Sequence, residues 1–349
     1  MRLIQVCLSD RYDESTRQVE TLVHTLAEKK IRQLLVCRRN SELHNKLRHL
    51  RNLPIVTSSS RFMGHFSVPR TGLVHAHDPQ AIQWARWQQR LRGTPWLLSW
   101  RDPDADSISQ LSQSSLKKAQ AMLVTSLATE QAMRERASCP VKRIPDVIQS
   151  LSTNPIKMTE LRSHYRGRFV IGHAGRLDSE GNQQMLVAAA EILHKELPGA
   201  IFVVLGEGPL LDKLSKKTAG LDNIDFVGEP EHPGDYYSVM NIFVDPANHA
   251  TTFAPLLQAM NFHIPVIASK VSGFAELISH RSNGLLFRKG DVKSLIEMIR
   301  VLYDSVPMRT RITRDAQSLV KESAPEQVAL KHLAVYQAII RSLKGESGS

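Results

Sequence analysis

The stretch "NIFVDPANHATTFAPLLQAMNFHIPVIAS", residues 241–269, decides the fold. Its apolar runs "NIFV" and "PVIAS" have the length of buried strands, and "PLLQAM" between them has the character of a helix. Pro255 suits the first turn of that helix, where its missing N–H costs no hydrogen bond. The stretch therefore predicts a strand, a loop, a helix and a second strand, and residues 249–260 contain no acidic residue.

The same alternation of apolar runs and amphipathic segments extends outward over the whole chain. Strand-like runs such as "RLIQVCL" and "RQLLVC" alternate with helical segments such as "STRQVETLVHTLAEKK" in the first half. A looser polar segment occupies 148–168, and the alternation restarts at "FVIGHAG", which begins at residue 169. This pattern is typical of parallel sheets with helices on both faces. We expect an α/β protein with two doubly wound, Rossmann-like domains at 1–160 and 168–325, and a C-terminal helix at 326–343 that packs back towards the first domain.

Composition is that of an ordinary soluble globular protein, with 42% apolar and 23% charged residues in 349. No run approaches the roughly 18 apolar residues that span a bilayer. The N-terminus turns polar after one strand's length, which does not fit a secretory signal. The three cysteines form no cluster with histidine, so we expect free thiols, no metal site and a cytoplasmic protein.

The net charge of +11 is partly local. Eight basic residues and one acid occupy the region 29–51. Such a region is either a solvated basic face or a surface for anionic lipid, a phosphorylated substrate or nucleic acid. Nucleic acid is disfavoured, because the sequence has neither zinc-finger spacing nor an aromatic RNA-binding strand.

Two doubly wound domains in sequence create a ligand cleft at the carboxyl ends of their strands. Three loops of the second half could reach it. In "HAGRLDSEGN", 173–182, Gly175 precedes Arg176, whose planar fork of donors can hold a diphosphate. In "LGEGPLLDKL", 205–214, two glycines at 206 and 208 flank Glu207, so that the backbone can approach an anion or a ribose. Taken alone, either loop also fits an ordinary strand end.

The third loop lies in the opening stretch. Thr251, Thr252 and Phe253 precede Pro255, where free backbone N–H groups and threonine hydroxyls would suit a phosphate. In the first half, "HAHD" ends a predicted strand. We expect His75 and His77 to lie on different sides of that strand end, with His77 a candidate for a catalytic or substrate-binding role and a structural histidine as the alternative.

Taken together, these motifs resemble the GT-B glycosyltransferases, specifically glycosyltransferase family 4. The matching order is "GRL", "GEGP", "FVG", "NIFVDP", "PLLQAMNFHIPVIAS" and "GFAELI", over residues 168–340. The first half matches more loosely, through "VHAHD" and "MLVTS". The resemblance implies the GT-B fold, with both Rossmann-like domains facing a cleft. It also implies retaining, metal-independent transfer from a nucleotide-sugar donor, in which Arg176 stabilises the leaving diphosphate.

Several positions depart from the family pattern. Where the family has Lys and Gly after Gly-Arg-Leu, this chain has Gly181 and Asn182. Where the family has the two acids of Glu-x7-Glu, it has Ala250 and Gln258, and the Gln258 amide still offers hydrogen bonds to a ribose. The family's active-site histidine falls on Arg101, and its glycine-rich turn is missing from 10–19. Loss of one electrostatic partner of a transition state costs roughly 10²–10³ in rate.

Three functions are therefore compatible with the sequence. The first is a hexosyltransferase of cell-envelope polysaccharide or lipopolysaccharide biosynthesis, with His77 or Arg101 facing the acceptor or the donor sugar. Its partners would be a nucleotide-diphosphate sugar, with no other cofactor, and an anionic saccharide or lipid-linked acceptor. The region 29–51 would then contact the inner face of the membrane. The second is an inactive GT-B protein that binds or scaffolds an active transferase, and the third is a nucleotide-binding enzyme of different chemistry.

Overall fold

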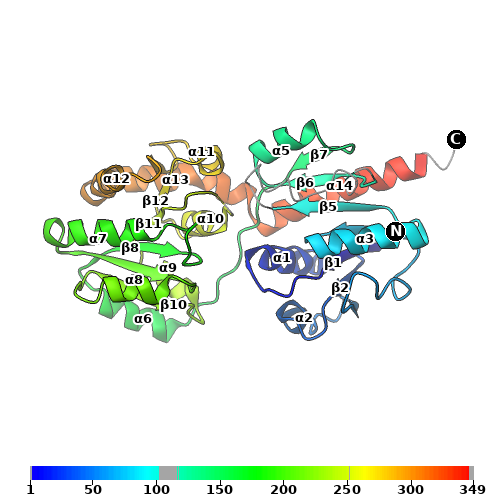
Figure 1. Ribbon diagram of the computed structural model, residues 1–349, viewed down its shortest axis with the longest axis horizontal. Helices are drawn as coiled ribbons and strands as arrows, with labels where there is room; N and C mark the ends of the chain where they lie inside the picture. Colours follow the sequence, from blue (N-terminus) through cyan, green and yellow to red (C-terminus); the bar gives the residue numbers. More distant parts are fainter. Residues whose placement is uncertain (1, 102–115, 117, 251, 346–349) are drawn as a thin grey trace. The chain divides into compact units, whose positions relative to one another are not determined.

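The computed structural model describes residues 2–101, 116, 118–250 and 252–345. The chain divides into two compact units, each built on its own parallel sheet (Figure 1). Unit 1 comprises Met1–Gln149 and Glu322–Ser349, and unit 2 comprises Ser150–Lys321. The chain thus leaves unit 1, forms unit 2, and returns to complete unit 1.

The sheet of unit 1 has the strand order β3-β2-β1-β4-β5-β6-β7, and all its paired strands are parallel. The order reverses between β1 and β4, which is the switch point of a doubly wound sheet. The strands are β1 (Arg2–Cys7), β2 (Gln33–Cys37), β3 (Ile55–Thr57), β4 (Gly72–Ala76), β5 (Trp96–Trp100), β6 (Met122–Val124) and β7 (Val141–Arg143).

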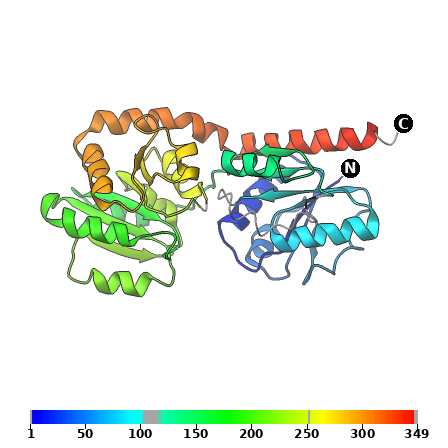
Figure 2. The ribbon, with the colours of Figure 1, turned by 45° about the horizontal axis from the view of Figure 1, so that its top comes forward.

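Helices cover both faces of this sheet, so its central strands β1, β4 and β5 are buried except at Arg2, the first residue of β1. The described helices are α1 (Glu14–Glu28), α2 (Glu42–Leu47), α3 (Pro79–Arg92), α5 (Leu127–Arg134) and α14 (Pro325–Gly345). One face packs Val74 and Trp96 against Trp84 of α3. On the other face, Leu22 of α1 and Tyr336 of α14 share one cluster with strand residues, and the two helices contact each other (Figure 2).

The sheet of unit 2 has the strand order β10-β9-β8-β11-β12-β13, again with parallel pairing. Its strands are β8 (Phe169–Ala174), β9 (Ala200–Leu205), β10 (Ile224–Gly228), β11 (Ile242–Asp245), β12 (Val266–Ser269) and β13 (Leu285–Phe287). Its helices are α6 (Pro155–His164), α7 (Gln184–Glu196), α8 (Leu211–Lys217), α9 (Pro233–Tyr237), α10 (Ala254–Asn261), α11 (Ser272–Leu277), α12 (Val292–Asp304) and α13 (Val306–Glu322). The switch point lies between β8 and β11.

The expected fold class is confirmed in both halves, because each run of buried residues forms a strand of a parallel sheet. One element was not expected. The polar segment at 148–168 contains the helix α6, which Asn154 caps by accepting from the N–H groups of Ile156 and Lys157. Of its residues only Leu161 is buried, so no helical apolar period marks it in the sequence.

Candidate functional site: the strand ends of each unit

In unit 2 the loops after β8 and β9 are joined by their backbones. The N–H of Gly175 donates to the carbonyl of Leu205 at 3.1 Å, and the N–H of Leu177 donates to that of Glu207 at 2.9 Å. Gly206 has φ +122°, and a Cβ at this position would lie 2.0 Å from the Gly175 carbonyl oxygen. Only glycine therefore permits this approach.

The next glycine is needed for a similar reason. A Cβ on Gly208 would lie 2.3 Å from the carbonyl oxygen of Leu177, which accepts from the N–H of Leu210 at 3.1 Å. Between the two glycines, Glu207 is exposed. The predicted residues Gly175, Gly206 and Gly208 thus form one double loop at the carboxyl edge of the sheet.

Arg176 lies at the tip of this double loop. Its side chain is 71% exposed, and its Nε is 3.4 Å from Asp178 Oδ2. An exposed ion pair of this kind is weak, so the guanidinium can exchange Asp178 for a phosphate at little cost.

At position 181, where the family has a lysine, the loop packs around Gln183. A Cβ on Gly181 would lie 2.8 Å from the Arg176 carbonyl oxygen, so a lysine does not fit this loop conformation. Asn182 adopts φ +52°, and the buried Gln183 donates to the Arg176 carbonyl at 2.8 Å. The replacement at 181 is thus part of a different local packing and not a simple loss of charge.

The opening stretch forms the start of α10 at the end of β11. Phe253 is the buried N-cap residue, and its own side chain makes no capping hydrogen bond. Thr252 Oγ1 instead accepts from the N–H of Ala254, the first residue of the helix, at 3.1 Å. Thr251 lies outside the described residues. Gln258 is buried on the first turns of the helix.

Ala250 fills the position of the first family acid. It is buried, and a Cβ on Gly273 of α11 would lie 2.6 Å from the Ala250 Cβ. The close packing of these two residues leaves little room for a longer side chain at 250.

Two titratable side chains at the centre of this edge were missed from the sequence. Burial raises the pKa of Asp245, the last residue of β11, to about 6, although its carboxylate accepts from the N–H of Ala247. Burial lowers the pKa of His173 on β8 to about 4, and its Nδ1 donates to the Val244 carbonyl at 2.9 Å. Position at a strand end was the available signal for Asp245, but burial cannot be read from sequence alone.

In unit 1, His77 and Arg101 lie together beyond the carboxyl ends of β4 and β5. Arg101 Nη2 is 3.3 Å from His77 Nδ1, and both residues are largely buried. The expectation that His75 and His77 diverge is wrong. Residues i and i+2 of a strand share one face, and the two ring centroids are 3.9 Å apart.

Unit 1 has a small pocket at this edge, which is partly open to solvent. The carboxyl ends of β5, β6 and β7, together with α1 and α14, supply its walls. Its polar lining includes Ser99, Arg101, Thr125, Asp146 and His332. Arg101, predicted from the sequence, is thus placed in a pocket, together with a histidine from the C-terminal helix.

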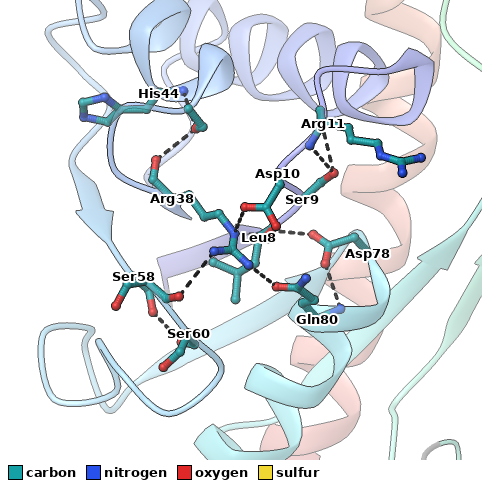
Figure 3. Close-up of polar contacts among 12 residues, drawn as sticks. Leu8, Ser9, Asp10, Arg11, Arg38, His44, Ser58, Ser60, Asp78 and Gln80 are labelled. Carbon is teal, nitrogen blue, oxygen red and sulfur yellow. Dashed lines mark hydrogen bonds and ion pairs between the residues drawn. The ribbon is translucent and has the colours of Figure 1, made fainter.

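The loop after β1, where the family has a glycine-rich turn, is closed by Arg38 (Figure 3). Arg38 Nε lies 2.7 Å from both the Leu8 carbonyl oxygen and Asp10 Oδ1, and Nη2 donates to Gln80 Oε1 at 2.6 Å. Asp78 accepts from the Leu8 N–H at 2.6 Å and caps α3. The charge of Arg38, one of the basic residues of 29–51, is thus paired within the fold.

The basic residues at 29–51 do not share one face. Lys29, Lys30 and Arg32 precede β2, whereas Arg38 and Arg39 follow it, and five strand residues separate them by about 17 Å. The exposed residues Arg48 and Arg51 lie after α2 and before β3, at the same edge as Lys29.

Within the described ranges, no group of three or more His, Cys, Asp and Glu side chains is arranged to hold a metal ion. The described helices also include none that combines the length and apolar character needed to cross a bilayer.

Comparison with known proteins finds a family match in the second half of the chain. Residues 168–305 match the family model for glycosyl transferases group 1. A lipopolysaccharide core mannosyltransferase of Rhizobium meliloti, LpsB, is 31% identical over 139 residues, which are 39% of each chain. The capsular polysaccharide glycosyltransferase CapM of Staphylococcus aureus is 21% identical over 183 residues, 51% of this chain and 48% of the relative. The chain thus matches half or less of the length of these curated relatives.

Solved structures match the whole chain at low identity. Anabaena HepE in complex with UDP aligns with a TM-score of 0.82 and 17% identity, over 97% of this chain and all of that one. Sucrose-phosphate synthase of Thermosynechococcus elongatus aligns with a TM-score of 0.77 and 17% identity, over 98% of this chain and all of that one. The expected resemblance to GT-B glycosyltransferases is confirmed: the chain has the GT-B fold, and its residues 168–305 match the model of the glycosyl transferases group 1 family.

Proposed function

We propose that this protein is a glycosyltransferase that moves a hexose from a nucleotide-diphosphate sugar to a glycan or glycolipid acceptor of cell-envelope polysaccharide or lipopolysaccharide biosynthesis. The observation that carries the proposal is the double loop of unit 2, where Gly206 meets the Gly175 backbone and Arg176 extends into solvent. Such a loop lets a nucleotide approach the backbone closely, and it places the Arg176 guanidinium where it can bind the phosphates.

The donor would lie along the residues predicted from the sequence. Arg176 would hold the diphosphate together with the N-terminus of α10, where the Thr252 hydroxyl already accepts from the N–H of Ala254 and can still donate to a phosphate oxygen. Glu207, Gly208 and Gln258 would face the nucleoside. Positive charge supplied in this way would take the place of a metal ion, as in the metal-independent reaction that the family resemblance implies. Retention of the anomeric configuration is implied by the resemblance alone. A uridine nucleotide is the first donor to test, because Anabaena HepE binds UDP and UDP-glucose.

The acceptor would be held by unit 1, where His77 and Arg101 line or adjoin the pocket. An anionic membrane would contact the exposed basic residues that share one edge of the sheet, which are Lys29, Lys30, Arg32, Arg48 and Arg51. Sedimentation with phosphatidylglycerol vesicles at low and high salt tests that contact.

Calorimetry with UDP, GDP and UDP-glucose tests the donor site, and transfer from UDP-[¹⁴C]glucose to a membrane extract, with and without EDTA, tests the reaction. We expect binding of a nucleoside diphosphate and EDTA-resistant transfer, with the anomeric configuration of the product read by NMR. No binding at millimolar ligand would exclude the proposal. Binding without transfer to any acceptor would instead support the inactive, scaffolding protein.

A further inference from the structure

A continuous chain of buried polar side chains links Arg101 to the C-terminal helix of unit 1. A guanidinium can only donate hydrogen bonds, so His77 Nδ1, 3.3 Å from Arg101 Nη2, must accept. The proton of the neutral His77 ring is therefore on Nε2, which donates to Gln5 Oε1 at 2.8 Å. This contact also fixes the orientation of the Gln5 amide.

The same donor-to-acceptor direction of the hydrogen bonds continues beyond Gln5. Its Nε2 faces the hydroxyl of Tyr336, at a long 3.5 Å, and that hydroxyl is 2.7 Å from His75 Nδ1. Tyr336 is buried, and its proton finds an acceptor only at His75 among the described contacts. His75 then carries its proton on Nε2 and donates to Ser99 Oγ at 2.7 Å.

The opposite direction, in which His75 donates to Tyr336, is disfavoured because of where it leaves the phenolic proton. If His75 donated to Tyr336, the phenolic proton would be buried without an acceptor among the described residues, which costs about 1–3 kcal/mol. In the favoured direction the last proton belongs to Ser99, which lines the pocket and can donate to a ligand or to water. Burial and the neighbouring Arg101 cation also lower the pKa of both histidines, so neither ring gains a second proton.

Both ends of the chain open into the same pocket of unit 1. Arg101 Nη1 is buried and has no hydrogen-bond partner among the described residues, and Ser99 lines the same pocket. His332 Nδ1 lies 2.9 Å from the Val328 carbonyl and donates to it, which leaves Nε2 as an acceptor. The pocket therefore offers both donors and acceptors.

We propose that Tyr336 and His75 are positioning residues, which hold His77 as the hydrogen-bond acceptor of Arg101 and keep Arg101 Nη1 and the Ser99 hydroxyl directed at a ligand oxygen. Because Asp146 lines the same pocket and offsets the charge of Arg101, a neutral hydroxyl suits this site better than an anion. Identification of this ligand as a sugar hydroxyl rests on the proposed function, whereas the tautomers do not.

Long-range ¹H–¹⁵N correlation of the ¹⁵N-histidine-labelled full chain tests the tautomers directly. We expect His75 and His77 to show the Nε2–H pattern, with signals assigned through His75→Gln and His77→Gln. Tyr336→Phe should convert His75 to a mixture of tautomers, because its Nδ1 loses the phenolic proton. His173 in unit 2, which donates through Nδ1, is the internal control for folding. An Nδ1–H pattern on His77, or an unchanged His75 signal in Tyr336→Phe, would overturn the proposal.

The second measurement is turnover of UDP-glucose by the same variant. We expect Tyr336→Phe to lower kcat about fivefold, the equivalent of one hydrogen bond, with the affinity for UDP unchanged. An altered tautomer with unchanged kcat would show that the chain does not position Arg101. If the wild-type protein binds UDP but has no turnover, the proposed function fails, and the NMR result alone decides the positioning role.

Discussion

At the scale of single residues, burial changes what a side chain can do. Asp245 and His173 are ordinary polar residues in the sequence, yet both are buried at the carboxyl edge of unit 2. With pKa values of about 6 and about 4, both shifts favour the neutral forms. Near neutral pH His173 is therefore uncharged, whereas Asp245 is still mostly ionised and becomes neutral only below about pH 6.

Asp245 should make stability depend on pH. Its folded-state pKa is raised, so its contribution to stability is complete below about pH 4 and is lost as the pH rises through about 6. Asp245→Asn keeps the oxygen that accepts from Ala247 and removes the ionisation. We expect the variant to match the wild type at pH 4 and to exceed it by up to about 3 kcal/mol at pH 7.5. Urea unfolding at both pH values measures this, and a difference independent of pH would contradict the assignment.

Arg176 should act through charge alone, because its side chain is exposed. We expect Arg176→Ala to weaken UDP binding at least tenfold, the cost of one charge-assisted pair, with an unchanged melting temperature. Calorimetry measures the affinity. The matched control is Arg314→Ala, which removes another exposed arginine of unit 2, on α13. Equal affinities for both variants and the wild type would show that the donor site lies elsewhere.

At the scale of elements, the loops after β8 and β9 act as one piece. Their backbone hydrogen bonds and the absent Cβ atoms at 206 and 208 hold the two strand ends in contact. The glycine spacing is visible in the sequence, but the partner loop that makes it necessary is not.

Gly206→Ala should separate these loops, since its Cβ would overlap the Gly175 carbonyl and φ +122° is strained for alanine. We expect the free energy of unfolding to fall by roughly 3 kcal/mol or more, and we expect UDP binding to be lost as well. Gly220→Ala is the control, because no atom lies within 4 Å of its Cβ position and no positive φ is required. Thermal unfolding and calorimetry of both variants decide the point. A fully stable Gly206→Ala protein would refute the close approach.

At the scale of the whole molecule, unit 1 is discontinuous and unit 2 is continuous. α14 supplies Val328, Tyr336 and Ile339 to a core cluster of unit 1, about 180 residues after the rest of that unit ends. Unit 2 has its own large core within a single segment.

We therefore expect a fragment of residues 150–321 to fold alone and to bind UDP as the full chain does. A chain truncated after residue 321 should lose the cooperative unfolding of unit 1, because the removed helix exposes the cluster around Tyr336. Circular dichroism melts of both fragments measure this. A native-like transition of unit 1 in the truncated chain would contradict the role of α14.

The fold could be predicted almost completely from the sequence. Strand and helix periods are local, and strands buried on both faces appear as apolar runs, so the order of elements implies two parallel sheets. The positions of Gly175, Arg176 and Arg101 at the carboxyl ends of strands could also be predicted, and their roles in a site stay predictions. The helix α6 was missed because it is almost wholly exposed and has no apolar period.

By itself, the sequence determined the architecture and the loops in which chemistry would lie. Only the tertiary structure decided the contacts within those loops. These contacts include the hydrogen bond of Arg38 to the loop after β1 and the close packing around Gly181. They also include the contact between Gln5 and Tyr336, which are 331 positions apart in the sequence. Such contacts depend on strand register and on the path of the chain, and therefore no local pattern records them.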